Sequence, residues 1–114
     1  MIEAYGFGEM VIDGKPYNKD LIIFPDGKVF HPWRRKEGHR VAVSDIDELL
    51  KSKLDVLVIG TGNPGLMKPE SGLLSRAETL GIKLAVSPTK DAVSKYNKLA
   101  KTRKEVGACF HLTC

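Results

Sequence analysis

The chain has 114 residues, 42% hydrophobic and 28% charged, which is an ordinary composition for a globular protein with room for one core. A formal net charge of +4, dispersed along the sequence, demands no nucleic-acid partner, and no apolar run is long enough for a membrane helix. Because the first residues carry no secretory or mitochondrial signal, we expect one cytoplasmic domain over residues 1–114 with no membrane contact.

The first third of the sequence predicts β-structure joined by tight turns. The segments FGEMVI and KPYNKDLIIF (15–24) flank Asp13 and Gly14, a pair that readily adopts the positive φ of a hairpin turn. The turn PDG (25–27) then separates LIIF from KVF, since proline fixes φ at the first turn position and glycine relieves strain at the last. We therefore expect an N-terminal β-meander.

From Ser44 onward the hydrophobic period becomes that of helices alternating with strands. Ser44 is expected to cap a helix over DIDELLKSK, with Ile46, Leu49 and Leu50 inward. The segment LDVLVIG is predicted to be a strand that is buried on both faces. IKLAV is expected to be another buried strand, and VGACFHLT the last one.

Two more helices are expected between these strands. One covers about 70–80 and is closed by Gly81, and the other covers about 89–103. Their predicted inward residues are Leu73, Leu74, Ala77, Leu80, Ala92, Val93, Tyr96, Leu99 and Ala100. The order predicts an α/β fold: a three-layer α/β/α domain with a mixed, largely parallel central sheet and an N-terminal β-meander.

Glycines at 60, 62 and 65 have the G-x-G-x-x-G spacing of a dinucleotide-binding turn. The fingerprint is incomplete, because Pro64 and Pro69 keep the chain out of a helix and no acidic residue ends the next strand. The simpler interpretation is a tight turn. A small anion held by backbone amides is the alternative, and the residues of that ligand-binding hypothesis are Gly60, Thr61, Gly62, Asn63, Gly65, Ser87 and Thr89.

The segment HPWRRKEGHR (31–40) predicts a polar surface loop. One aromatic residue among four basic ones, with Glu37 in their midst, is more typical of a charged loop than of a nucleic-acid surface. If the tryptophan is exposed, a protein partner is the better hypothesis, and its residues are Trp33, Arg34, Arg35 and His39.

The ending CFHLTC holds both cysteines, which are expected to be free thiols because a disulfide would close almost no loop. Strand alternation places Cys109 and His111 on one face and Phe110 and Cys114 on the other. We therefore predict no Cys-His dyad, no metal site and no cofactor, and interpret Cys114 as a small buried hydrophobic residue.

The whole chain resembles the family of adipogenesis-associated Mth-domain proteins. The resemblance rests on FGEMVIDGKPYNKDLIIFPDGKV, LVIGTG, TKDAVSKYNKLA and CFHLTC, and it covers essentially residues 1–114. It implies the same three-layer fold, and it draws attention to Trp33, His39, Gly60, Gly62, Thr89, Tyr96, Asn97, His111 and Cys114.

About activity the resemblance implies less, since the family has no established catalysis. The related mitochondrial complex I assembly factor 3 acts by binding proteins, which favours a non-enzymatic protein-interaction, assembly or regulatory role. The ending GACFHLTC looks nearest to the branch linked to adipogenesis and cell differentiation in the cytoplasm. We expect a protein partner for a monomer or weak homo-oligomer, with small-molecule binding or catalysis at the glycine turn as the alternative.

Overall fold

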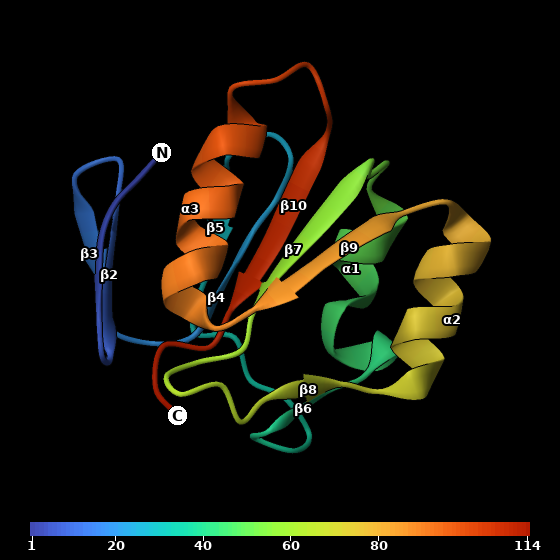
Figure 1. Ribbon diagram of the computed structural model, residues 1–114, viewed down its shortest axis with the longest axis horizontal. Helices are drawn as coiled ribbons and strands as arrows, with labels where there is room; N and C mark the ends of the chain where they lie inside the picture. Colours follow the sequence, from blue (N-terminus) through green and yellow to red (C-terminus); the bar gives the residue numbers. More distant parts are fainter.

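The computed structural model describes residues 1–114 (Figure 1). The strands are β1 Ile2–Gly6, β2 Glu9–Ile12, β3 Lys15–Tyr17, β4 Leu21–Ile23, β5 Val29–Phe30, β6 Arg40–Val41, β7 Val56–Gly60, β8 Lys68–Pro69, β9 Lys83–Ser87 and β10 Val106–Phe110. The helices are α1 Asp47–Lys51, α2 Ser71–Leu80 and α3 Thr89–Ala100, and the 3-10 turn η1 Val43–Ile46 precedes α1.

The central sheet has the strand order β5-β4-β10-β7-β9 and is mixed. β7 pairs in parallel with both β10 and β9, whereas β4 is antiparallel to β10 and β5. The strands β1, β2 and β3 form a separate antiparallel sheet, and β6 pairs in parallel with β8. The carboxyl ends of β7 and β10 therefore lie at the same end of the central sheet as the beginning of β4.

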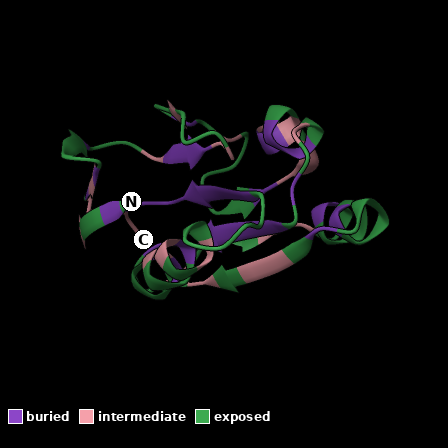
Figure 2. Ribbon diagram, turned by 90° about the horizontal axis from the view of Figure 1, so that it is seen from above, coloured by how far each residue is buried: buried purple, intermediate pink, exposed green.

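A hydrophobic core lies on each face of the central sheet, because successive side chains of a strand point to opposite faces. Val56 and Val58 of β7 pack with α3 and the N-terminal sheet, while Leu57 and Ile59 pack with α1 and α2. Figure 2 shows these helices on opposite sides of the sheet. The predicted mixed α/β fold with an N-terminal antiparallel sheet is confirmed.

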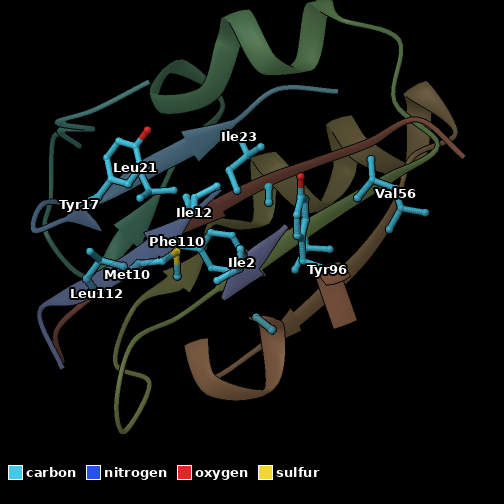
Figure 3. Packing of buried hydrophobic residues seen from close by; sticks show 14 residues of the cluster. Ile2, Met10, Ile12, Tyr17, Leu21, Ile23, Val56, Tyr96, Phe110 and Leu112 are labelled. Carbon is cyan, nitrogen blue, oxygen red and sulfur yellow. The ribbon is translucent and has the colours of Figure 1, made fainter. Parts of the chain in front are cut away.

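The first core joins the N-terminal sheet to α3 (Figure 3). Tyr96 of α3 stands edge-on to Phe110, with ring centres 6.2 Å apart. Asn97 joins the same helix to the first strand: its Oδ1 accepts the amide of Ile2 at 2.9 Å, and its Nδ2 donates to the carbonyl of Ile2 at 2.8 Å. These two positions of the family resemblance therefore have packing roles.

Both predicted turns are confirmed by their backbone angles. Asp13 and Gly14 have φ of 49° and 80° in the hairpin between β2 and β3, and Gly27 has φ of 91° between β4 and β5. The segment 15–24 is not one strand as predicted, because β3 and β4 belong to different sheets.

Three details of the helical half differ from the prediction. Ser44 lies inside η1 and caps nothing; Asp45 accepts the amide of Ala42 there at 2.8 Å. Leu74 and Leu80 were expected inward but are 45% and 49% exposed. The third helix ends at Ala100, which is exposed.

The predicted burial of the strand IKLAV is also wrong. β9 is an edge strand of the central sheet, so only β7 pairs with it. Leu84 is only half-buried, and Val86 is exposed.

Candidate functional site

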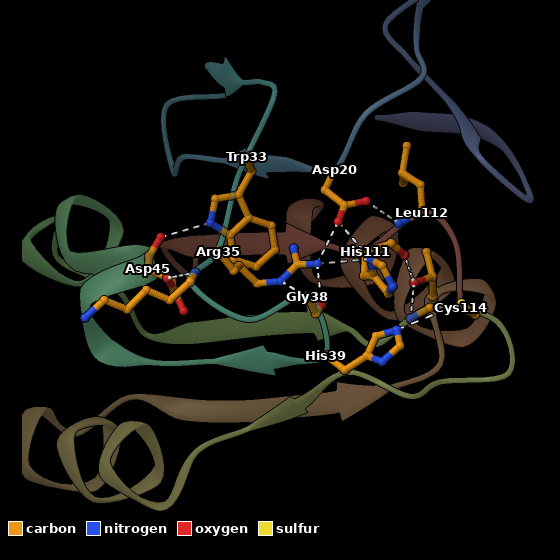
Figure 4. A network of polar contacts seen from close by, with 12 residues as sticks. Asp20, Trp33, Arg35, Gly38, His39, Asp45, His111, Leu112 and Cys114 are labelled. Atoms are coloured by element: carbon orange, nitrogen blue, oxygen red, sulfur yellow. Dashed lines mark hydrogen bonds and ion pairs between the residues drawn. The ribbon is translucent and has the colours of Figure 1, made fainter.

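A group of polar side chains lies at the end of the central sheet where β7 and β10 end and β4 begins (Figure 4). The register of the sheet explains this position, because Phe110 at the end of β10 pairs with Leu21 at the start of β4. The loop before β6 supplies the other members. We call the following residues the polar cluster: Asp20, Arg35, His39, His111 and Cys114.

Asp20 is the centre of the polar cluster. Nδ1 of His111 lies 2.7 Å from its Oδ2, and Nη2 of Arg35 lies 2.9 Å from the same oxygen. The amide of Leu112 donates to its Oδ1 at 2.8 Å. The side chains of Arg35 and His111 are only 4% and 8% exposed, so solvent screens these contacts weakly.

These donors set the ionisation of Asp20. Burial raises the pKa of its carboxyl group, but hydrogen bonds from His111, Leu112 and Arg35 outweigh burial, and the pKa falls below the ordinary value of 3.8. Because an ionised carboxylate only accepts hydrogen bonds, Nδ1 of His111 carries the proton of their bond. The other ring nitrogen of His111, Nε2, is a buried atom without a hydrogen-bond partner.

Trp33 supports the polar cluster through Arg35. Trp33 is 4% exposed, its Nε1 donates to the carbonyl of Asp45 at 2.9 Å, and the guanidinium carbon of Arg35 lies 4.5 Å from the ring centre. Nη2 of Arg35 also donates to the carbonyl of Gly38 at 2.7 Å. The prediction of Trp33 and Arg35 as surface residues is therefore wrong, although Arg34 and His39 are exposed.

The tail, which we define as residues 111–114, occupies the glycine turn. The amide of Asn63 donates to the carbonyl of Thr113 at 2.8 Å, and the amide of Leu66 donates to the Cys114 oxygen at 2.9 Å. The amide of Gly62 donates to Oγ1 of Thr89 at 2.8 Å. These three amides are used within the protein and are not free to hold the small anion of the alternative hypothesis.

Close packing explains two of the three glycines. A β-carbon at Gly60 would lie 2.5 Å from Cδ1 of Phe110. Gly62 has φ of +103°, and a β-carbon there would overlap the carbonyl oxygen of Thr113 and lie 2.7 Å from Cδ2 of His111. The glycines thus have packing roles, although the segment after Gly60 is a loop that leads to β8 rather than the tight strand-to-helix turn that was predicted.

The other residues of the ligand-binding hypothesis also line this packed turn. Thr89 is fully buried and its Oγ1 donates to the carbonyl of His111 at 2.6 Å. Thr61 is buried and approaches Gly65, where a β-carbon would lie 2.9 Å from Oγ1 of Thr61. Oγ of Ser87 is buried without a partner.

The structure thus brings together most positions that the resemblance singled out. Trp33 and His39 come from one loop, Gly62 and Thr89 from the turn and the start of α3, and His111 from the tail. Asp20 is the member that the sequence did not reveal. Its only signal is an acidic residue before an apolar strand, and the pairing of that strand with β10 is not readable from either segment.

Cys114 differs from its prediction. It is half-buried rather than part of the core, and its Sγ lies 3.9 Å from Nε2 of His39. No group of three or more His, Cys, Asp and Glu residues is arranged to hold a metal ion.

Apart from the polar cluster, the surface is hollowed beside β5. Two hollows of about 950 and 590 Å³ share Phe24 and Phe30 in their walls. We call them together the β5 groove.

The fold and the site define a class of protein: a mixed α/β domain with an N-terminal antiparallel sheet and a buried Asp-His-Arg contact at the ends of its parallel strands. A family model described as "Protein of unknown function (DUF498/DUF598)" matches residues 2–111. The chain belongs to this DUF498/DUF598 family.

Solved structures agree with this assignment. The conserved hypothetical protein PH1505 from Pyrococcus horikoshii OT3 is 27% identical, with a TM-score of 0.85 over 100% of this chain and 99% of that one. MT938 is 29% identical, with a TM-score of 0.82 over 100% and 98%. A Bordetella pertussis protein described as an Mth938-like domain is 16% identical with a TM-score of 0.78 over 98% and 85%, and at this identity shows the fold alone.

These likenesses confirm the Mth-type part of the family resemblance. No helix of the structure combines the length and the apolar character that a membrane crossing requires.

Proposed function

We propose that the protein is a non-enzymatic interaction domain that binds an extended segment of a partner protein in the β5 groove. The observation that carries this proposal is the exposure of Phe30, which is 54% accessible between two adjoining hollows. A large aromatic side chain held at the wall of a groove is a common feature of protein contact surfaces.

The backbone of β5 supports an extended occupant. β5 ends the central sheet, and no strand lies beyond it. The amide of Phe24 donates to the carbonyl of Lys28, and Ile22 pairs with Phe30. Because bonded and non-bonded pairs alternate along an antiparallel ladder, the backbone groups of Val29 point away from β4 and are available to an added strand.

The groove walls suggest the chemistry of that segment. Phe24 and Phe30 offer apolar contact to one side chain of the occupant. The rim carries both signs of charge, with Lys28 and Lys53 along the first hollow and Glu48 along the second. We therefore commit to a strand-forming segment with a central apolar residue and charged residues of both signs beside it.

A phage-displayed random peptide library selected on the full chain tests this proposal. Phe30→Glu is the disruptive variant, and Phe7→Glu is its matched control because Phe7 is also exposed but lies outside both hollows. We expect selected peptides to bind the natural chain and Phe7→Glu alike and to lose at least about tenfold in affinity for Phe30→Glu, the loss typical of an interface anchor. Hydrogen exchange at the Val29 amide should also slow on binding.

Two results would count against the proposal. One is a selection without enriched peptides, and the other is enriched peptides that bind Phe30→Glu as tightly as the natural chain. Circular dichroism of both variants establishes that they are folded before the affinities are compared.

The cellular role that we infer is regulation or assembly in the cytoplasm, connected with cell differentiation. Its support is the likeness of the ending GACFHLTC to the adipogenesis-associated branch, together with the protein-binding role of the mitochondrial relative. Imaging of the tagged full chain in differentiating cells tests the location; accumulation in mitochondria would contradict it.

A further inference from the structure

A thiol and an imidazole meet at the accessible margin of the polar cluster. Cys114 is half-buried, and its Sγ lies 3.9 Å from Nε2 of His39, which is exposed. The other thiol is different: burial raises the pKa of Cys109 to about 12, so that this side chain is protonated and closed off in β10. Of the two thiols, only Cys114 combines access with a neighbouring base.

A second, independent feature points to the same place. Nε2 of His111 has no partner although its side chain is more than nine-tenths buried. The Cδ2 edge of that ring faces Gly62, where a β-carbon would lie 2.7 Å from Cδ2 of His111 and 3.0 Å from the carbonyl carbon of Cys114. The imidazoles of His111 and His39 are 5.8 Å apart and stand edge to face beside Cys114 (Figure 4).

We propose that Cys114 exchanges with small disulfides and that His39 is its base. Nε2 of His39 takes the proton of the thiol, and the sulfur of Cys114 attacks one sulfur of the disulfide. A new S–S bond forms as the old one breaks, the leaving thiolate takes the proton from His39, and one small thiol is released. No oxidant other than the disulfide itself is required.

The remaining cluster residues hold this arrangement. Asp20 fixes the orientation of the His111 ring through Nδ1, and the buried Nε2 of the same ring has no partner within the protein. His39 is the titratable group in contact with the thiol, and His111 of the tail in turn contacts Arg35 from the loop and Asp20 from before β4. The hollow that His39 lines also carries Arg40, Lys68 and Glu70, and Arg40 is paired with Glu37 at 3.4 Å.

Oxidised glutathione is the probe, and the experiment uses the full chain. Peptide mapping by mass spectrometry should find the glutathione adduct on Cys114 and none on Cys109. His39→Gln should slow adduct formation at neutral pH at least about tenfold, since positioned bases commonly contribute more than this. The matched control is His31→Gln, because His31 is likewise exposed but lies against Tyr17, away from the thiol.

The pH dependence separates a base from a merely structural residue. The rate of adduct formation against pH should change shape in His39→Gln and keep its shape in His31→Gln. His39→Asn is measured beside His39→Gln, and thermal unfolding verifies that each variant is folded. Equal rates and equal pH profiles in the natural chain and both His39 variants would overturn the proposal, and so would adducts on Cys109 at the rate of Cys114.

Discussion

Replacement of Gly62 by alanine tests how tightly the tail fills the glycine turn. The new β-carbon would meet the carbonyl oxygen of Thr113 and lie 3.0 Å from the carbonyl carbon of Cys114, and both of these are backbone atoms. They can move only if the tail shifts as a unit. The backbone angle adds a second cost, because φ of +103° is unfavourable for any residue with a β-carbon.

The expected magnitude follows from these two costs. Left-handed strain costs about 1 kcal/mol, and overpacking against a fixed backbone costs about 2 kcal/mol, so the free energy of unfolding falls by about 3 kcal/mol. An entropy of unfolding of about 2.1 cal/mol/K per residue amounts to about 0.24 kcal/mol/K for 114 residues. The melting temperature should therefore fall by about 12 °C.

Differential scanning calorimetry with a matched glycine measures this effect. Gly81 also has positive φ, +72°, but a β-carbon there meets nothing within 4 Å. Gly81→Ala therefore carries only the strain of about 1 kcal/mol and should lower the melting temperature by about 4 °C. If Gly62→Ala and Gly81→Ala lower it equally, the tail does not pack on the turn as described, and the reasoning fails.

Two more predictions concern the polar cluster. Trp33→Ala should lower the free energy of unfolding, measured by urea titration, by about 3–5 kcal/mol, because the indole is buried. Arg34→Ala changes an exposed neighbour and should lower it by less than about 0.5 kcal/mol. Equal values for the two variants would contradict the burial of the indole. Because the folded protein lowers the pKa of Asp20, its contribution to stability is present above pH 3.8 and is lost as the pH falls further. The urea concentration at the unfolding midpoint of the natural chain should therefore decrease as the pH is lowered below 3.8. A decrease of the same size in Asp20→Asn would exclude Asp20 as the cause.

Much of the fold could be predicted because local patterns and tertiary structure agree. The pair Asp13 and Gly14 favours a hairpin turn through its local backbone preference, and the run VLVIG has the unbroken apolar character of a strand covered on both faces. Other features depend on distant residues. IKLAV is as apolar as a central strand, but its place at the sheet edge follows from the order of all five strands.

The candidate site was less predictable for the same reason. Trp33 has basic neighbours in the sequence, which favours a solvent-exposed position. The indole is nevertheless buried, because its Nε1 finds a hydrogen-bond acceptor in the carbonyl of Asp45. His111 and Cys114 were expected to point apart by strand alternation. That rule ends with β10 at Phe110, and beyond it the tail follows the glycine turn, which brings Cys114 to His39.

The central position of β10 has a consequence for synthesis on the ribosome. Every other strand of its sheet emerges earlier, yet β4 and β7 have no contact in the sheet except through β10. Until residues 106–110 leave the exit tunnel, the nascent chain therefore exposes the apolar edges of two unjoined half-sheets. The five-stranded sheet can form only after its middle strand has been translated, and chaperones that recognise exposed strand edges can bind the nascent chain before then.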